Sequence, residues 1–417
     1  MSSDSILQNA SIGAEIMDRI EALAKISESP NGLTRRYLTP EHRGANDLVG
    51  SWMRDSGMTV REDAVGNIIG RYPADCDDAP TLMIGSHLDT VVMAGKYDGM
   101  LGVVTGIACI GSLHGRRKHL PIAVEVVGFC DEEGARFQST YLGSRAVAGT
   151  FDRALLKCRD ENGICMDDAM IAFGLDPDRV HEAARRPDEL LAYIELHIEQ
   201  GPVLEEQGLA AGVVTGIAGA NRLIVTVTGT AGHAGTVPMK LRHDALLAAA
   251  ECSLVVETVV GDFRDTVGTV GRLDVSPGAT NVIPGQVVFS VDLRAAEDNL
   301  RLNASVEIQR QWQEIAARRG VDIVAEVVHA APSAHCAPHM QRQIAEAITR
   351  VEGRAVTLPS GAGHDAAAMA DVTDVGMIFV RCAGGVSHNP NEAITVADAD
   401  IGARVMLDLV ENFRAER

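Results

Sequence analysis

The stretch Leu82-Met83-Ile84-Gly85-Ser86-His87-Leu88-Asp89 runs from apolar residues directly into a cluster of polar ones. The next apolar run, residues 122–129, ends in the same way at Cys130-Asp131-Glu132-Glu133, and a helical stretch at 101–113 separates the two runs. Strands that alternate with helices predict an α/β sheet buried on both faces. In such sheets functional groups collect just beyond the carboxyl ends of the strands. We therefore expect the functional site where these two runs end.

A different pattern begins after residue 212. The elements expected there run strand, helix, strand, strand, helix, strand, at residues 223–230, 241–260, 269–275, 287–294, 300–319 and 322–329. This is the order of a ferredoxin-like unit. After residue 330 helices and strands alternate again. The sequence thus predicts an α/β fold, in which residues 1–212 and 331–417 form a catalytic domain with a central mixed sheet flanked by helices. Residues 213–330 are expected to form an inserted ferredoxin-like (βαββαβ) domain.

Composition excludes several classes of function. The chain has 417 residues, 46% hydrophobic and 23% charged, which is typical of a soluble globular protein. It has 37 basic and 57 acidic residues, and the net charge of −20 argues against nucleic acid or an anionic membrane as a partner. The amino-terminal residues 1–10 do not resemble a signal peptide, and the eight cysteines include no CxxC pair. We expect a cytoplasmic, non-membrane protein.

Two acidic residues lie close to His87 in the sequence. Asp89 is two residues further on, so in an extended segment its carboxylate points to the same side and can orient the imidazole as a ligand. Asp98 lies in the turn Tyr97-Asp98-Gly99, where the glycine permits a close approach of the backbone before a helix. The alternative interpretation of His87 and Asp89 is a core histidine beside an acid. The alternative for Asp98 is a helix cap.

Three more segments carry candidate ligands. Glu132 and Glu133 are neighbouring like charges at a strand end, which repel unless a cation or separate tasks use them; the alternative is a solvated strand end. His197 stands on the polar face of an alternating strand, between Leu196 and Ile198. His388 lies in a turn near the carboxyl end of the chain.

Together these residues suit a metal centre. Mixed imidazole and carboxylate ligands fit divalent Zn, Mn, Co or Ni, and one aspartate between two ions makes a two-metal hydrolytic centre. The candidate ligands are His87, Asp98, Glu133, His197 and His388. The pattern predicts a metal-dependent hydrolase with two divalent metal ions as cofactors.

These segments also resemble, in order, the metal-site motifs of the hydantoinase/carbamoylase family, which includes N-carbamoyl-L-amino-acid hydrolases, β-ureidopropionases and allantoate amidohydrolases. That family is related to the aminoacylase-type metallopeptidases. The matching segments are residues 85–90, 97–99, 131–137, 195–201 and 387–390. The resemblance implies that one ion is held by His87, Asp98 and His197 and the other by Asp98, Glu133 and His388. It also implies that Glu132 is the general base and that Asp89 orients His87.

The inserted domain has its own motif at residues 229–239, in which small residues surround His233. The resemblance makes His233 an oxyanion stabiliser and the inserted domain a lid and the main interface of a homodimer. It also implies substrate contacts, which are Gln200, Asn281, Arg294 and His364. From the residues alone, an exposed histidine and an ordinary ion pair of Arg294 remain alternatives.

The function implied is cleavage of the carbamoyl (ureido) C–N bond of an N-carbamoyl-L-amino acid or of allantoate, with release of ammonia and CO2. The substrate is then a small molecule that pairs a ureido group with a carboxylate. One alternative is an aminoacylase or dipeptidase acting on N-acyl amino acids. Another is a non-catalytic binding protein on the same scaffold, which should have lost Glu132 or a metal ligand.

Overall fold

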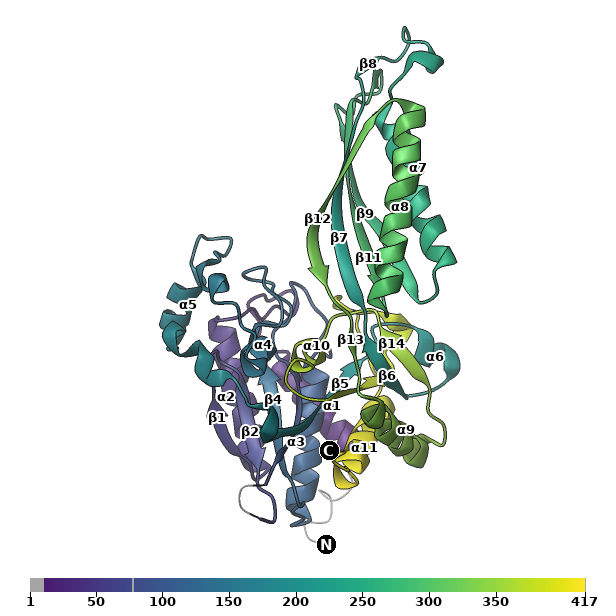
Figure 1. The fold of residues 1–417 in the computed structure, drawn as a ribbon. Helices are drawn as coiled ribbons and strands as arrows, with labels where there is room; N and C mark the ends of the chain where they lie inside the picture. Colours follow the sequence, from purple (N-terminus) through teal and green to yellow (C-terminus); the bar gives the residue numbers. More distant parts are fainter. Residues whose placement is uncertain (1–10, 77–78, 417) are drawn as a thin grey trace. The chain divides into compact units, whose positions relative to one another are not determined.

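The computed structural model describes residues 11–76 and 79–416 (Figure 1). The interpretation of residues 1–10 as lacking a signal peptide falls outside this range. The chain divides into two compact units. The first comprises residues up to Thr215, His335–Leu358 and Gly363–Arg417, and the second comprises Gly216–Ala334 and Pro359–Ala362. Within the described ranges, no helix has both the length and the apolar character needed to cross a membrane.

A nine-stranded mixed sheet forms the centre of the first unit. Strand β3 (Thr81–His87) pairs in parallel with β4 (Ala123–Phe129) and with β5 (Leu190–Ile198), and β5 pairs in parallel with β15 (Val375–Val380). The other strands extend it, several of them antiparallel: β1 (Thr59–Glu62), β2 (Ile68–Tyr72), β6 (Ala211–Ile217), β13 (Ala334–His335) and β14 (Thr357–Ser360). The parallel centre places the carboxyl ends of β3, β4 and β5 along one edge.

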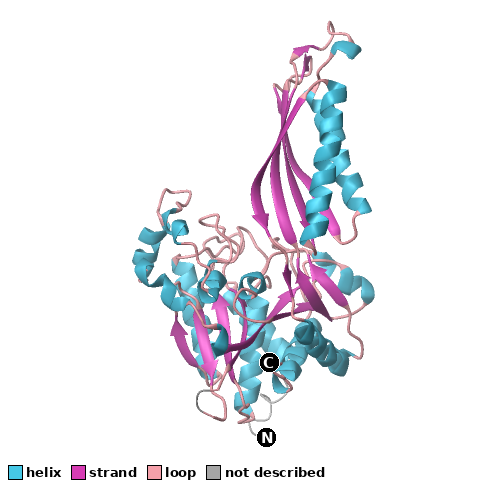
Figure 2. Ribbon diagram, in the orientation of Figure 1, coloured by secondary structure: helices cyan, strands magenta, loops and turns pink. Residues whose placement is uncertain are grey.

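Helices flank this sheet (Figure 2). Helix α1 (Ile12–Leu23) buries the stripe Ile16, Ile20 and Leu23, as the sequence spacing predicts. Helix α3 (Met100–Gly115) is apolar on nearly every side because it packs against β3 as well as against α1 and α11. The remaining helices of the unit are α2 (Pro40–Asp55), α4 (Leu142–Ala148), α5 (Met166–Phe173), α6 (Val203–Gln207), α9 (Pro338–Glu352), α10 (Asp365–Met369) and α11 (Val396–Glu411).

The second unit has a four-stranded antiparallel sheet in the order β12-β7-β11-β9. Its elements follow the chain order βαββαβ: β7 (Gly219–Thr228), α7 (Ala245–Asp262), β9 (Thr266–Ser276), β11 (Gln286–Ala295), α8 (Asp298–Arg319) and β12 (Asp322–Ala331). Alternate residues of β7 and β11 are buried with α7 and α8 in one core, and Figure 1 shows both helices along the same side of the strands. The predicted fold class, a mixed α/β sheet flanked by helices plus a second sheet domain, is confirmed.

A buried ion-pair network joins β4 to its neighbours. Glu125 is 3% exposed, and its oxygens lie 3.1 Å from Arg71 Nη1 and 2.6 Å from Arg185 Nη1. Removing one member of a buried pair leaves uncompensated charge and costs about 3–5 kcal/mol. Because Arg71 is partly exposed, we expect Glu125→Ala to lower the free energy of unfolding by about 3 kcal/mol, measured by denaturant unfolding of the apoprotein.

The control is Glu182→Ala, which removes an exposed pair with Arg179. Exposed pairs contribute less than about 1 kcal/mol, so this variant should unfold almost as the unchanged protein does. Equal losses in both variants would contradict the role assigned to Glu125.

Candidate metal centre

The carboxyl ends of three neighbouring parallel strands supply most of the site. His87 is the last residue of β3, His197 lies near the end of β5, and Glu132 and Glu133 follow the end of β4. His87 is 2% exposed, His197 1% and Glu132 7%. Strands that are parallel and adjacent end at the same edge of the sheet. This is why residues far apart in sequence come together, as the pattern of apolar runs predicts.

Asp98 lies at the centre of the cluster, in the loop before α3. Its Oδ1 is 3.6 Å from His87 Nε2 and 3.1 Å from His197 Nε2, whereas its Oδ2 is 3.2 Å from His388 Nε2. His388 Nε2 also lies 3.5 Å from Glu133 Oε1. The two oxygens of one carboxylate therefore face two separate sets of candidate ligands.

The loop reaches this position because its glycine has no side chain. Gly99 has φ 73°, and a Cβ there would lie 2.5 Å from the His87 ring. Four groups of described residues have ligand atoms within 4.8 Å of one another. Two of them are His87 with Asp98 and His197, and Asp98 with Glu133 and His388, while the other two overlap with these and contain Glu132 or His364. The first two groups are the ligand sets that the resemblance to the hydantoinase/carbamoylase family implies.

The hydrogen bonds of two histidines test whether the cluster fits a metal. Nδ1 of His87 donates to the backbone carbonyl of Asp89 (3.0 Å), and Nδ1 of His197 donates to that of Ile198 (2.9 Å). A ring that donates through Nδ1 presents Nε2 as the ligand atom. His197 Nε2 accepts the Gly99 N–H at 3.1 Å, as expected for a lone pair. In both rings Nε2 also lies near Asp98 Oδ1, and a divalent cation shared by imidazole nitrogens and a carboxylate oxygen fits this arrangement.

Burial and the neighbouring charges shift the pKa values of the residues in this cluster. Burial by itself lowers the pKa of His87, but the carboxylates of Asp98, Glu132 and Asp89 raise it well above the usual value. Burial raises the pKa of Glu132 well above its ordinary value, and burial together with the charge of Asp98 raises that of Glu133 to about 7. A cluster of buried acids with three imidazoles is a donor set that fits divalent metal ions.

Asp89 fixes the loop that carries the two glutamates. Its Oδ1 accepts the backbone N–H of Glu132 at 3.0 Å, and its Oδ2 accepts that of Glu133 at 3.1 Å. Its contact with the His87 ring is made by the backbone carbonyl, while the nearer carboxylate oxygen is 3.8 Å from Nδ1. Asp89 therefore aligns the Glu132–Glu133 backbone as well as the His87 ring.

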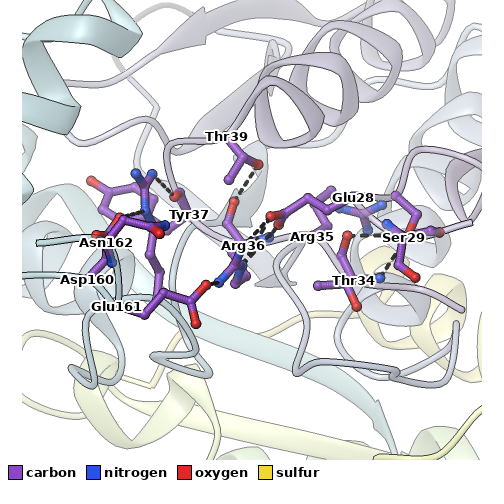
Figure 3. A network of polar contacts seen from close by, with 12 residues as sticks. Glu28, Ser29, Thr34, Arg35, Arg36, Tyr37, Thr39, Asp160, Glu161 and Asn162 are labelled. Carbon is purple, nitrogen blue, oxygen red and sulfur yellow. Dashed lines mark hydrogen bonds and ion pairs between the residues drawn. The ribbon is translucent and has the colours of Figure 1, made fainter. Parts of the chain in front are cut away.

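An arginine outside the predicted set contacts the two residues that flank Asp89 in the sequence. Arg35 is buried, its Nε donates to the carbonyl of Leu88 at 2.7 Å, and its backbone N–H donates to Thr90 Oγ1 at 2.9 Å. Figure 3 shows the polar contacts around this segment, among them the ion pairs of Arg36 with Glu28 and Glu161. Arg35 thus contacts the residues on both sides of Asp89, and the ion pairs of Arg36 hold the next position of the chain.

The comparison with known proteins gives the family. The model of peptidase family M20/M25/M40 matches residues 83–412, which include every candidate metal ligand. This chain belongs to the M20/M25/M40 family. It is a hydrolase, and the predictions of the family and of the enzyme class are confirmed.

Individual relatives of this M20/M25/M40 protein cover nearly its whole length. The N-carbamoyl-L-amino acid amidohydrolase of Geobacillus stearothermophilus is 44% identical over 95% of this chain and 98% of its own. Allantoate deiminase 1 of Glycine max is 39% identical over 95% of this chain and 89% of its own. A crystal structure of a hydantoinase/carbamoylase family amidase from Burkholderia multivorans has a TM-score of 0.90 at 33% identity, covering 97% of this chain and 98% of that one.

Two predicted substrate contacts of the first unit touch the ligands themselves. Gln200 Nε2 donates to Asp98 Oδ2 at 3.1 Å and to Ser387 Oγ at 2.9 Å. His364 is 1% exposed, and its ring lies edge-on to that of His197 with 4.4 Å between centroids. Burial and the neighbouring His197 lower the pKa of His364 well below the usual value, so this ring is neutral.

The second unit of the M20/M25/M40 chain places His233 beside Asn281. The short strand β8 (Gly232–His233) pairs with β10 (Val282–Ile283), and the carbonyl of Asn281 accepts the N–H of Ala234 at 3.0 Å. His233 is exposed, and its Nδ1 accepts the N–H of Gly235 at 3.0 Å, so the ring proton is on Nε2. His233 is therefore a hydrogen-bond donor at its outer nitrogen.

Arg294 in β11 forms an ion pair within the second unit. Its Nε and Nη2 donate to the two oxygens of Asp292 at 2.7 and 3.0 Å, and its Nη1 donates to the carbonyl of Gly361 at 2.7 Å. Arg222 also contacts Asp292, at 3.1 Å. One carboxylate thus meets two guanidinium groups.

Sequence reasoning missed two buried acids, Glu195 and Glu392, which accept hydrogen bonds from segments next to the candidate ligands. Glu195 accepts hydrogen bonds from Ser86 Oγ at 2.8 Å and from the N–H of Ala366 at 2.9 Å, and so connects β5 to β3 and α10. Glu392 contacts the loop that carries Asp98. Their signal in the sequence is only that each lies within a few residues of a histidine ligand.

Proposed function

We propose that this M20/M25/M40 hydrolase is a metal-dependent amidohydrolase that cleaves the carbamoyl (ureido) C–N bond of an N-carbamoyl-L-amino acid or of allantoate, releasing ammonia and CO2. The observation that carries the proposal is the arrangement around Asp98, whose two oxygens face two ligand sets, with Glu132 beside them. The substrate class is supported by two relatives named for N-carbamoyl-L-amino acids and for allantoate.

We propose a binuclear centre of two divalent ions, Zn or Mn, Co or Ni. His87, Asp98 and His197 would hold one ion, and Asp98, Glu133 and His388 the other. When bound, such ions supply a polarised substrate carbonyl and a water of lowered pKa. Gln200 and Ser387, which contact Asp98 Oδ2, would keep the shared carboxylate in place.

Glu132 is the proposed general base. Its carboxylate is buried next to the ligands while its backbone is fixed by Asp89, so it has a defined position and few competing partners. It takes a proton from the water whose oxygen attacks the carbamoyl carbon, and it returns a proton to the leaving nitrogen as the C–N bond breaks. Such a residue must hold and release a proton in one cycle.

Second-unit residues are proposed to bind the substrate. Arg294 would bind the substrate carboxylate, with Asn281 as a further contact. The two-point contact of its guanidinium with the Asp292 carboxylate supports this assignment, because it is the geometry that a substrate carboxylate needs. His233 would donate its Nε2 proton to the developing oxyanion. Gln200 and His364 are proposed as further substrate contacts.

We also propose that the second unit acts as a lid and forms the interface of a homodimer. Apolar side chains on its two helices support the interface, since Leu254 of α7 is 62% exposed and Val306 of α8 is 67% exposed. Sedimentation equilibrium tests the proposal, with a dimer expected and a monomer contradicting it. The cytoplasmic location and the absence of nucleic acid or membrane partners stay predictions from the sequence.

His233→Ala should lower kcat by about 10² to 10³-fold with little change in KM, because it removes one donor to the oxyanion. The measurement is steady-state kinetics on the substrate that the wild type hydrolyses best. The matched control is His243→Ala, a second exposed histidine of the same unit, which should keep wild-type kinetics. Equal kcat values for the two variants would remove His233 from the oxyanion role.

The substrate assignment is tested by ammonia release from a panel of compounds. Apoprotein is supplied in turn with Mn, Zn, Co or Ni, and incubated with allantoate, N-carbamoyl-β-alanine and several N-carbamoyl-L-amino acids. N-acetyl-L-amino acids and dipeptides are followed by amine release, which tests the aminoacylase and dipeptidase alternatives. The proposal expects turnover of a ureido substrate above that of any acyl substrate. Faster turnover of N-acetyl amino acids or dipeptides would contradict it. So would the absence of turnover with every compound of the panel.

A further inference from the structure

Glu392 links the two loops that carry Asp98 and His388. It lies between β15 and α11 and is 3% exposed. Its Oε1 accepts the backbone N–H of Tyr97 at 2.8 Å and of Asp98 at 3.1 Å, and its Oε2 accepts the hydroxyl of Ser387 at 3.0 Å. One carboxylate thereby joins two loops that lie almost 300 residues apart in the sequence.

The contact continues through Ser387 to the shared ligand. Ser387 Oγ lies 3.2 Å from Asp98 Oδ2 and 3.0 Å from Glu392 Oε2, so its single proton can be donated to either carboxylate. The same hydroxyl accepts from Gln200 Nε2 at 2.9 Å. Glu392 therefore contacts the backbone of Asp98 directly and its carboxylate through one hydroxyl.

The chain makes room for this arrangement. Gly95 passes so close that a Cβ there would lie 2.2 Å from the Glu392 carboxylate carbon. Glu392 itself belongs to none of the ligand sets found among the described residues. A buried acid that contacts a ligand's backbone without being a ligand has the properties of a positioning group.

We propose that Glu392 is a positioning residue that fixes the Asp98 and His388 loops together, so that Asp98 presents one oxygen to each ligand set. The inference rests on the proposed metal centre and concerns metal affinity. It assigns Glu392 no contact with the substrate.

The experiment measures metal affinity by titrating apoprotein with Mn²⁺, and apoprotein stability by its Tm. Glu392→Ala is expected to weaken binding by about 10- to 100-fold, the usual effect of removing a partner of a ligand. Glu392→Gln keeps an oxygen for the two N–H groups and an amide that can donate to Ser387 Oγ. Its affinity should stay within about threefold of the wild type, since it retains all three contacts. Glu392→Asp, which is too short to reach both loops, should behave as the alanine variant and serves if that variant does not fold.

Glu352→Ala is the matched control. Glu352 also accepts two backbone N–H groups, from Ala210 and Ala211 at 2.6 and 3.2 Å, but it contacts no ligand. It should lower Tm without changing metal affinity. Wild-type affinity in Glu392→Ala, or equal losses in the Gln and Ala variants, would overturn the inference. If the wild type itself binds no metal, the proposed function fails. If the wild type binds metal and Glu392→Ala binds it equally well, the function stands and this inference fails.

Discussion

Glu132→Gln is expected to lower turnover by about 10² to 10⁴-fold while the protein keeps its metal, because a positioned proton-transfer group contributes rate enhancements of that size. Glutamine has nearly the same shape as glutamate but cannot accept a proton. The backbone of residue 132 is held by Asp89 and not by its own side chain, so the substitution should leave the loop in place. Metal content by elemental analysis and steady-state kinetics on a ureido substrate measure the two effects.

The neighbouring residue supplies the control. Glu133→Gln changes the same kind of side chain one position along the chain, but its carboxylate lies 3.5 Å from His388 Nε2 in a ligand set. This variant should lose metal as well as activity. Near-normal turnover of Glu132→Gln at full metal occupancy would remove Glu132 from the role of base, and metal loss in that variant would make it a ligand instead.

Asp98→Asn is expected to abolish activity and to weaken metal binding by more than about 100-fold. Loss of a group that only hydrogen-bonds to a ligand already lowers metal affinity by about 10- to 100-fold, and Asp98 is itself a proposed ligand. Asparagine keeps the size of the side chain but presents one oxygen and one NH2 group. Whichever way the amide turns, the NH2 group faces either His388 or the pair His87 and His197. A donor in the place of a ligand oxygen repels a cation, so one ligand set is lost outright.

Equilibrium dialysis against buffered Mn²⁺ measures this loss, with circular dichroism to show that the variant is folded. Asp47→Asn, at an exposed position in the middle of α2 and in none of the ligand sets, controls for the loss of one negative charge. Retention of two ions by folded Asp98→Asn would exclude the shared-ligand arrangement.

The fold was largely predictable because its strong signals are local. Apolar runs such as those ending at His87 and Phe129 predict buried parallel strands, and the carboxyl-end rule then predicts which polar residues meet. Boundaries were less predictable. The helix expected from residue 241 begins at Ala245, because Asp244 accepts the N–H groups of Leu246 and Leu247 as a cap.

The site was predictable only in part. The meeting of Asp98 with His388 depends on two loops that lie far apart in sequence, and only the resemblance to a known family indicated it. Glu392 and Arg35 act on backbone N–H or carbonyl groups, and such contacts impose no spacing on the sequence. Among 57 acidic residues, nearness in the sequence to His388 is not enough to single out Glu392 before the loops are seen together.

Metal titration of the apoprotein tests the central claim most directly. Protein stripped by chelation is titrated with Mn²⁺ or Zn²⁺, and bound metal and ammonia release from the preferred ureido substrate are measured on the same samples. We predict no turnover without metal and a plateau of activity at two ions per chain. Full activity in the chelated protein, or a plateau reached with one ion bound, would contradict a binuclear centre shared through Asp98.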